Sequence, residues 1–180
     1  MTSIALLLGS LRADSVNRKI AELLRDEAPA GIEVTIVEGL GDLPFYNEEL
    51  DGEQVPDAVR VLRETVAAAD RVLAVTPEYN GTMPAVLNNA IDWLSRPYGA
   101  GALVKKPFGV VGAAPTPYGA KWSHADALRS AGIAGALPVE DVTVSHSTLE
   151  ADPITDEAAR AKLIDALRRL AEAQPESAAA

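Results

Sequence analysis

The stretch IALLLGSLRADSVNRKIAELL, residues 4–24, contains a strand pattern, a polar loop and a helix pattern in direct succession. Its first part, Ile4–Leu8, is continuously apolar, as expected for a strand buried on both faces of a parallel sheet. Its last part repeats apolar residues at the spacing of one helix face: Val16, Ile20, Leu23 and Leu24. We call the polar segment between these two patterns, Gly9–Asn17, the first loop.

The rest of the chain repeats this alternation of strand and helix patterns. Further strands are predicted at Glu33–Val37, Arg71–Thr76, Phe108–Gly112 and roughly Asp141–Ser145. Three further helix faces are marked by apolar residues: Val59, Leu62 and Val66; Val86, Leu87, Ala90, Ile91 and Leu94; Leu163, Ile164, Leu167 and Leu170. The last of these helices should cover about Asp156–Ala173 with Thr155 as its N-cap, and a weaker helix should cover about Lys121–Ala131, ended by Gly132. Five strands alternating with five helices predict a doubly wound α/β sandwich.

A second polar loop, TPEYNG at Thr76–Gly81, follows the third predicted strand. In the flavodoxin-like strand order 2-1-3-4-5, strands 1 and 3 are neighbours, and ligands bind at the carboxyl ends of the strands where the connections diverge. We therefore predict a five-stranded parallel sheet of this order with helices on both faces. In such a sheet the first and second loops meet at a single ligand site.

The first loop has the composition of an anion site. Four of its side chains can donate hydrogen bonds: Ser10, Arg12, Ser15 and Asn17. The loop leads into a helix N-terminus, whose free N–H groups and dipole favour an anion. A terminal phosphate dianion suits such hydroxyls and a guanidinium. The alternative is that Ser15 is only an N-cap, Asn17 a first-turn residue and Arg12 a solvated charge.

A dinucleotide site is the rival interpretation of this region. Glu38 closes the second predicted strand, where a ribose-binding acid could sit. A Rossmann turn, however, requires G-x-G-x-x-G, and here only Gly9 is present, followed by Leu11 and Arg12. We therefore expect no primary dinucleotide site at this turn and interpret Glu38 as a surface residue.

The second loop suits the edge of a planar polar ring. Pro77 restrains the turn and Gly81 allows a close approach of the backbone. Backbone N–H groups from Glu78 to Gly81 could bond the ring edge, Tyr79 could cover the ring, and Asn80 could hydrogen-bond it or position the loop. PEYNG is also a good generic turn sequence. Taken together, the two loops indicate bound flavin mononucleotide (FMN).

Composition limits the number of domains, the partners and the metal or thiol chemistry that the chain can have. The 180 residues, 48% of them apolar, predict one domain over residues 1–174 and a frayed tail at residues 175–180. The net charge of −10 argues against nucleic acid and anionic membranes as partners. Cysteine is absent, which excludes disulfides, thiolate catalysis and Cys-ligated zinc. The two histidines, His124 and His146, lie in separate regions, so no metal site is expected.

Two further segments bear on location and on loop function. The first residues lack the basic region and cleavage site of a signal peptide, and no run of about 18 apolar residues occurs, so a cytoplasmic protein without a spanning helix is expected. The connection Gly39–Gln54 is unusually long for this class. It is either a functional loop or a disordered excursion.

At its two loops the chain strongly resembles the NADPH-dependent FMN reductase family of flavodoxin-like oxidoreductases, which includes FMN, quinone, chromate and azo-dye reductases. The resemblance rests on G-S-x-R-x-x-S-x-N, from Gly9 to Asn17, and on P-E-Y-N, from Pro77 to Asn80, which continues into GTMPAVLNNAIDWLSR. Both motifs are intact, in order and at the family's usual separation. The resemblance covers about residues 3–170.

This resemblance implies roles for individual residues. The FMN phosphate would be bound by Ser10, Arg12, Ser15 and Asn17, and the isoalloxazine ring would be lined by Pro77, Glu78, Tyr79, Asn80 and Gly81. The resemblance also implies a third loop against the flavin, here GAAPTPYGAKW at Gly112–Trp122, with Thr116 and Gly119 as candidate contacts. Gly119–Ala120 stands where relatives often carry paired glycines. NADPH (or NADH) would be the cosubstrate, and a homodimer or homotetramer the assembly.

The predicted function is an NAD(P)H-dependent, FMN-containing oxidoreductase that passes hydride through flavin N5 to a small acceptor in a ping-pong scheme. Free flavin, a quinone, an azo compound or a metal oxyanion would fit as acceptor. Because the cofactor carries the chemistry, no side chain is predicted to be catalytic. One alternative is an FMN-binding electron-transfer module without its own NAD(P)H oxidation. Another is a scaffold or sensor that binds no flavin.

Overall fold

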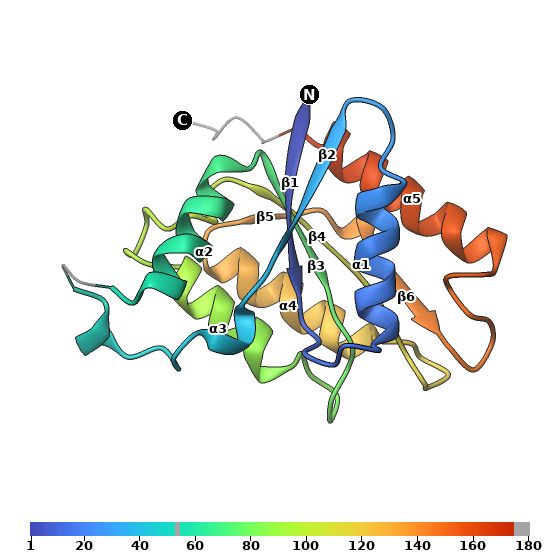
Figure 1. Ribbon diagram of the computed structural model, residues 1–180, viewed down its shortest axis with the longest axis horizontal. Coiled ribbons are helices and arrows are strands. Elements are labelled where there is room, and N and C mark those ends of the chain that lie inside the picture. Colours follow the sequence, from blue (N-terminus) through green and yellow to red (C-terminus); the bar gives the residue numbers. More distant parts are fainter. Residues whose placement is uncertain (53–54, 175–180) are drawn as a thin grey trace.

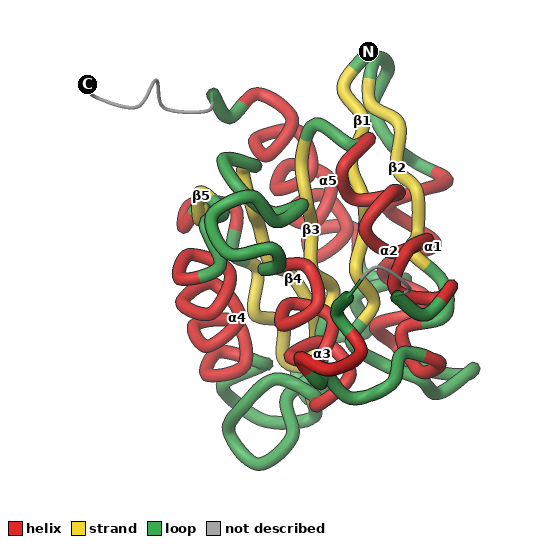
Figure 2. Tube along the Cα trace, turned by 90° about the vertical axis from the view of Figure 1, so that its left-hand side faces the viewer, coloured by secondary structure: helices red, strands yellow, loops and turns green. Residues whose placement is uncertain are grey.

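The computed structural model describes residues 1–52 and 55–174. Within these ranges a parallel sheet lies between two layers of helices (Figures 1 and 2). The strands are β1 (Thr2–Leu8), β2 (Ile32–Val37), β3 (Arg71–Val75), β4 (Pro107–Ala114), β5 (Leu137–Pro138) and β6 (Val144–Ser147). The α-helices are α1 (Val16–Asp26), α2 (Asp57–Ala68), α3 (Ala85–Leu94), α4 (Lys121–Ile133) and α5 (Glu157–Glu172). Short 3-10 helices lie at η1 (Leu40–Asp42), η2 (Glu48–Leu50) and η3 (Glu140–Val142).

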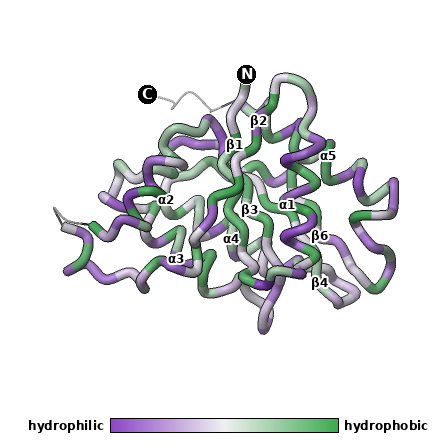
Figure 3. Tube along the Cα trace, in the orientation of Figure 1, coloured by the Kyte–Doolittle hydropathy of each residue, from purple (hydrophilic) through white to green (hydrophobic). Residues whose placement is uncertain are grey.

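Alternate residues of β1 build the two halves of the core. Ile4 and Leu6 pack with the apolar residues of α1 and α5 on one face of the sheet. Ala5 and Leu7 pack with those of α2, α3 and α4 on the other face. In Figure 3 the hydrophobic colour runs along β3, while hydrophilic residues gather on the outer turns of α1 and α5. Burial of β1 on both faces confirms the interpretation of the opening apolar run.

The strand order is β2-β1-β3-β4-β5, as predicted, and every pairing is parallel. The predicted fifth strand is corrected in one respect, because it is divided in two. β5 pairs with the start of β4, and β6 pairs with Val111–Ala114 at its end. Between them the chain leaves the sheet in η3, which places Val142 in the core. Asp141 and Val142, predicted as strand residues, therefore lie in this 3-10 helix.

Two predicted helix ends also differ from the structure. The N-cap of α5 is Asp156, whose carboxylate accepts a hydrogen bond from the Ala159 N–H at 2.8 Å, and not Thr155. Aspartate accepts this bond readily and its charge suits the positive end of the helix dipole. Helix α4 continues past Gly132 to Ile133, and the left-handed residue that follows the helix is Gly135, with φ 96°.

The long connection after β2 is bonded to α3 through Pro44 and Tyr46. The Pro44 carbonyl accepts hydrogen bonds from Trp93 Nε1 at 2.8 Å and from Asn89 Nδ2 at 3.0 Å. The Asn89 side chain also accepts from the Tyr46 N–H at 2.8 Å. These hydrogen bonds fix this part of the connection to α3. Glu53, Gln54 and the predicted tail at residues 175–180 lie outside the described residues. No helix in the described ranges is long and apolar enough to cross a membrane.

Candidate functional site

A cleft of about 610 Å³ opens at the carboxyl edge of the sheet between the first loop, the second loop and the end of β4. Seven residues predicted from the sequence line it together: Ser10, Arg12, Ser15, Asn17, Pro77, Glu78 and Tyr79. The first and second loops therefore meet, as the strand order requires, because β1 and β3 are neighbours in the sheet.

Thr76, the first residue of the second loop, lies tightly against two glycines, Gly9 in the first loop and Gly112 in β4. A Cβ atom on Gly9 would lie 2.6 Å from Thr76 Oγ1, and a Cβ atom on Gly112 would lie 2.1 Å from the Thr76 carbonyl oxygen. Real Cβ contacts do not reach such distances, so both positions require glycine. As a result, the start of the second loop lies directly against the first loop and β4.

The first loop presents hydrogen-bond donors to the cleft. Ser10 is only 2% exposed, and its hydroxyl forms no hydrogen bond within the described part of the chain. Ser15 is the N-cap of α1, and its Oγ accepts from the Asn17 N–H at 3.2 Å. The other N–H groups of the first helical turn have no partner inside the helix. A hydroxyl that faces the cleft from a largely buried serine, beside a helix N-terminus, suits a phosphate oxygen.

Asn17 has a different role from its neighbours. Its Nδ2 donates to the Ala113 carbonyl at 2.9 Å, and its Oδ1 accepts from the Ala113 N–H at 2.9 Å. Both ends of the amide are therefore bonded to β4, and the residue is buried. In this arrangement the side chain joins the start of α1 to the floor of the cleft.

The charges around the first loop are partly balanced within the protein. Lys19 Nζ lies 2.6 Å from Asp14 Oδ1, and this hydrogen bond raises the pKa of Lys19 and lowers the pKa of Asp14. Arg12 lines the same cleft, is exposed, and forms no ion pair among the described residues. Arg12 is therefore the cation of the first loop that is available to a ligand anion.

The second loop is a tight turn. The Tyr79 N–H donates to the Thr82 carbonyl at 3.0 Å, and the Thr82 N–H donates to the Tyr79 carbonyl at 3.1 Å. Asn80 and Gly81 occupy its centre with φ of 53° and 74°, the positive values of a type I′ turn. These two residues shape the turn and do not line the cleft, whereas Tyr79 lines it and remains 49% exposed.

The start of the second loop is bonded to the first turn of α4. Glu78 Oε2 accepts from the backbone N–H groups of Trp122 and Ser123 at 2.9 and 3.1 Å, and so caps a helix that has no side-chain cap of its own. Ser123 Oγ donates to the Pro77 carbonyl at 2.8 Å. The loop and the helix end are therefore held in one fixed arrangement.

His124 extends this contact into the core. Its Nε2 faces the Thr76 carbonyl at 3.4 Å and its Nδ1 faces Ser145 Oγ at 2.8 Å. The carbonyl assigns the proton to Nε2, so Nδ1 accepts from the serine hydroxyl. Burial lowers the pKa of His124 from 6.5 to about 4, against the opposing effect of the hydrogen bond to Thr76. The imidazole is therefore neutral at pH 7. It supports the start of the second loop from the core side, through its contact with the Thr76 carbonyl.

The third loop contributes less to the cleft than the sequence predicted. Thr116 Oγ1 donates to the Gly119 carbonyl at 2.9 Å, and the Gly119 N–H donates to the Thr116 carbonyl at 3.1 Å. Gly119 has φ 60° and packs against the backbone of Ser145. Neither Thr116 nor Gly119 lines the cleft, while Ala113 and Pro115 do.

The segment after β6 forms a further wall that the sequence analysis missed. Thr148, Asp152 and Pro153 line the same cleft. His146 holds this turn, because its Nε2 lies 2.8 Å from the Ala151 carbonyl. The rule that located the other loops could have found this one, since β6 is parallel and ends at the same edge of the sheet.

Residues 2–150 match the sequence profile of the NADPH-dependent FMN reductase family. The chain belongs to this family. FMN reductase membership agrees with the resemblance of the two loop motifs, and the match ends just before the turn that carries Asp152.

Relatives and solved structures support the assignment. A flavoenzyme NAD(P)H:(acceptor) oxidoreductase, FerB from Paracoccus denitrificans, has a TM-score of 0.84 at 32% identity, with 96% of each chain covered. A quinone reductase of Pseudomonas putida is 47% identical over 117 residues, which are 65% of this chain and 62% of that protein. A 2-hydroxy-1,4-benzoquinone reductase of Burkholderia is 42% identical over 109 residues, 61% and 58% of the two proteins. The chain thus spans about three-fifths of the length of these two relatives.

Proposed function

We propose that this protein is an FMN-containing oxidoreductase that takes hydride from NADPH (or NADH) and passes it to a small acceptor, with quinones as the first class to test. The observation that carries the proposal is the first loop. There the hydroxyl of Ser10 and the guanidinium of Arg12, neither with a partner among the described residues, and a helix N-terminus line one side of the cleft.

The donor set fits a phosphate monoester. A terminal phosphate is a dianion that accepts several hydrogen bonds, and charge-assisted bonds from hydroxyl, guanidinium and backbone N–H groups are the strong kind. We propose that Ser10, Arg12 and Ser15 bind the phosphate directly. Asn17 contributes by placing the helix N-terminus, since its amide is bonded to Ala113 at both ends.

The second loop would hold the ring by its backbone. The side chain of Glu78 is bonded to α4, and Asn80 and Gly81 form the centre of the turn. We propose that Pro77, Glu78 and Tyr79 line the ring, with the half-exposed Tyr79 against one face. Asn80 and Gly81 set the turn, and Thr116 and Gly119 shape the third loop without touching the ring.

FMN, when bound, supplies reversible hydride transfer, which no side chain of this protein provides. The protein's own residues then bind, orient and partly shield the reacting ring. We assign no acid or base to a side chain. Because nicotinamide and acceptor would use the same face in turn, the kinetics should be ping-pong. The names of the relatives, quinone reductase among them, favour a quinone as acceptor.

The deciding experiment is a visible absorption spectrum of the purified protein, followed by anaerobic addition of NADPH and, separately, NADH. Bands near roughly 375 and 450 nm that are bleached by nicotinamide support the reductase. Flavin that stays oxidised with both nucleotides favours an electron-transfer module that needs a separate reductase. A colourless protein that takes up no added FMN overturns the cofactor assignment.

Three other features stay predictions. The single domain over residues 1–174, the cytoplasmic location and assembly as a homodimer or homotetramer come from the sequence and the family resemblance. Light scattering of the purified protein at several concentrations would determine the assembly, because a monomer at all concentrations contradicts it.

A further inference from the structure

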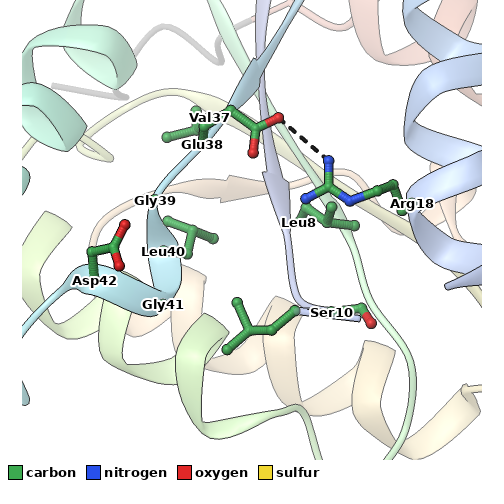
Figure 4. Close-up of a pocket in the computed structure, with 10 residues that line it drawn as sticks. Leu8, Ser10, Arg18, Val37, Glu38, Gly39, Leu40, Gly41 and Asp42 are labelled. Atoms are coloured by element: carbon green, nitrogen blue, oxygen red, sulfur yellow. Dashed lines mark hydrogen bonds and ion pairs between the residues drawn. The ribbon is translucent and has the colours of Figure 1, made fainter. Parts of the chain in front are cut away.

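The first and second loops differ in how neighbouring parts of the fold support them. A cavity of about 360 Å³ lies between the first loop and the turn after β2, and Ser10 and Gly41 are among the residues that line it (Figure 4). The Arg18–Glu38 ion pair spans this cavity, with Nη1 3.4 Å from Oε1 (Figure 4). The second loop lies instead against α4 and is bonded to that helix at its start and just after its end.

The start of the second loop is bonded to the first turn of α4 residue by residue. The carbonyls of Thr76 and Pro77 face side chains of α4, and the Glu78 carboxylate accepts from two backbone N–H groups of the same turn. These contacts fix the chain as it enters the turn at residues 79–82. They leave open what fixes the chain where it leaves this turn.

Asp126, one turn further along α4, bonds to the end of the turn. Thr82 Oγ1 donates to Asp126 Oδ2, and Arg129 Nη2 donates to Asp126 Oδ1, so each carboxylate oxygen has one partner. The hydrogen bonds from Thr82 and Arg129 lower the pKa of Asp126, and the charged carboxylate is a stronger acceptor than a neutral one. Within the described ranges, this is the one side-chain hydrogen bond that residues 79–82 make.

Thr82 is the residue that pairs with Tyr79 across the turn. The Tyr79 N–H and carbonyl are both bonded to the Thr82 backbone, at 3.0 and 3.1 Å. The Tyr79 side chain lines the cleft, is 49% exposed, and makes no hydrogen bond to residues 1–52 or 55–174. The position of this side chain therefore depends on the turn, and the turn depends on Thr82.

We propose that Asp126 is a positioning residue for the flavin: through Thr82 it fixes the turn at residues 79–82 and so holds Tyr79 against the ring. The inference rests on the proposed function, in which Tyr79 lies against one face of the ring. Asp126 and Thr82 do not line the cleft, so both act through Tyr79.

The expected effect is on the affinity for the ring. A side chain that is already held in place loses little freedom when a ligand binds, so the ligand binds more tightly. Without Asp126, part of the binding free energy would be used to order the turn. Met83, the next residue, is buried in the core, so the chain beyond the turn stays in place and the fold is retained.

The test removes each partner of the hydrogen bond in turn. Asp126→Ala removes the acceptor, Thr82→Val removes the donor with little change of shape, and Thr82→Ser keeps the hydroxyl. Asp57→Ala is the matched control, because Asp57 pairs with Arg60 at the same i,i+3 spacing on α2, outside the cleft. Fluorescence titration of the flavin-free proteins measures the affinities for FMN and riboflavin. Amide hydrogen exchange of the Tyr79 and Thr82 N–H groups, without flavin, measures the order of the turn.

Asp126→Ala and Thr82→Val should each weaken the binding of both flavins about fivefold, and the double variant should be no weaker than either alone. Thr82→Ser should restore the affinity lost in Thr82→Val, and Asp57→Ala should match the wild type. Exchange at Tyr79 and Thr82 should be faster in Asp126→Ala and Thr82→Val. In a Tyr79→Ala background, Asp126→Ala should cause no further loss of affinity, because the residue through which it acts is absent.

Unchanged flavin affinities in Asp126→Ala overturn the inference, whatever the exchange rates, while FMN binding stands. An equal loss in Asp57→Ala, or a further loss in the Tyr79→Ala background, overturns it as well. A wild type that binds neither flavin overturns the proposed function. The exchange rates then still test the turn, since equal exchange in wild type and Asp126→Ala shows that Asp126 does not fix it.

Discussion

In the first loop the Ser10 hydroxyl and the Arg12 guanidinium line the cleft without partners in the described residues, whereas in the second loop the Glu78 carboxylate is bonded to α4. Asn80 of the second loop is used for the turn itself. The first loop can therefore bind through side chains, and the second through its backbone and Tyr79. Substitutions in the first loop should change ligand affinity, while those in the second should change the stability of the fold.

The largest expected effect concerns the support of the second loop by His124. Burial lowers the pKa of this imidazole to about 4 in the folded protein, so the unfolded chain, with a pKa near 6.5, binds the proton first. The free energy of unfolding should be at its full value above pH 6.5. It should fall by up to about 3 kcal/mol as the pH drops towards 4.

Urea unfolding of wild type and His124→Gln between pH 7 and 4.5 measures how much stability is lost when His124 takes up a proton. Other groups titrate in both proteins, so the difference between their pH slopes isolates the imidazole. The variant should show the shallower slope. Equal slopes would mean that His124 is not held neutral against the Thr76 carbonyl, and the second loop would lose this support.

The next effect is an exception to the rule that first-loop substitutions change affinity and not stability. Asn17 belongs to the first loop but has a structural role. Asn17→Ala should lower the free energy of unfolding of the FMN-free protein by about 2 kcal/mol, since the Ala113 N–H and carbonyl lose their partners in a buried place. Asn88→Ala, an exposed asparagine of α3, is the matched control. Unchanged stability with lost FMN binding would instead make Asn17 a direct ligand.

Arg12 gives the clearest test of binding through side chains. Arg12→Ala should weaken FMN binding by about tenfold and leave riboflavin binding unchanged, because only FMN carries the phosphate. The free energy of unfolding of the FMN-free protein should stay within about 0.5 kcal/mol of wild type, since Arg12 is exposed and forms no ion pair within residues 1–52 and 55–174. Fluorescence titration with both flavins measures the affinities, with Arg25→Ala at the other end of α1 as control.

An equal loss of FMN and riboflavin affinity in Arg12→Ala would remove the phosphate site from the first loop. Loss of stability in the same variant would place Arg12 with the structural residues. Either result would contradict the distinction between the two loops, because neither loop would then bind the flavin phosphate through a side chain.

The sequence was sufficient to locate the two loops. It did not indicate which of their residues face the ligand and which support the fold. Apolar runs at β1 and β3 and the doubly wound order suffice to bring the loops to one edge, since neighbouring parallel strands end together. The partner of the Asn17 amide, Ala113, lies 96 residues away, and the partners of Glu78 lie 44 and 45 residues away. No local pattern encodes such distant pairings, so a motif predicts a site residue without its role.

The same limit explains why the last strand was predicted undivided and why one wall of the cleft was missed. The division of the last strand depends on Val142, whose side chain leaves the strand register to fill the core between β4 and α5. A single valine between polar residues does not indicate, from sequence alone, that the strand is interrupted there. The wall formed by Thr148 and Asp152 was missed because that segment contains no motif. Only the topology indicates that it faces the cleft.

The smallest expected effect tests whether the Glu78 charge acts on the helix or on the ligand. Glu78→Gln keeps an oxygen that can accept from the Trp122 and Ser123 N–H groups but removes the charge at the N-terminus of α4. The free energy of unfolding should fall by about 0.5–1 kcal/mol, and FMN affinity should change less than twofold. Glu150→Gln, an exposed acid outside the cleft, is the control for the loss of charge. If Glu78→Gln keeps the full stability but weakens FMN binding, the carboxylate serves the ligand, and the second loop, like the first, binds through a side chain.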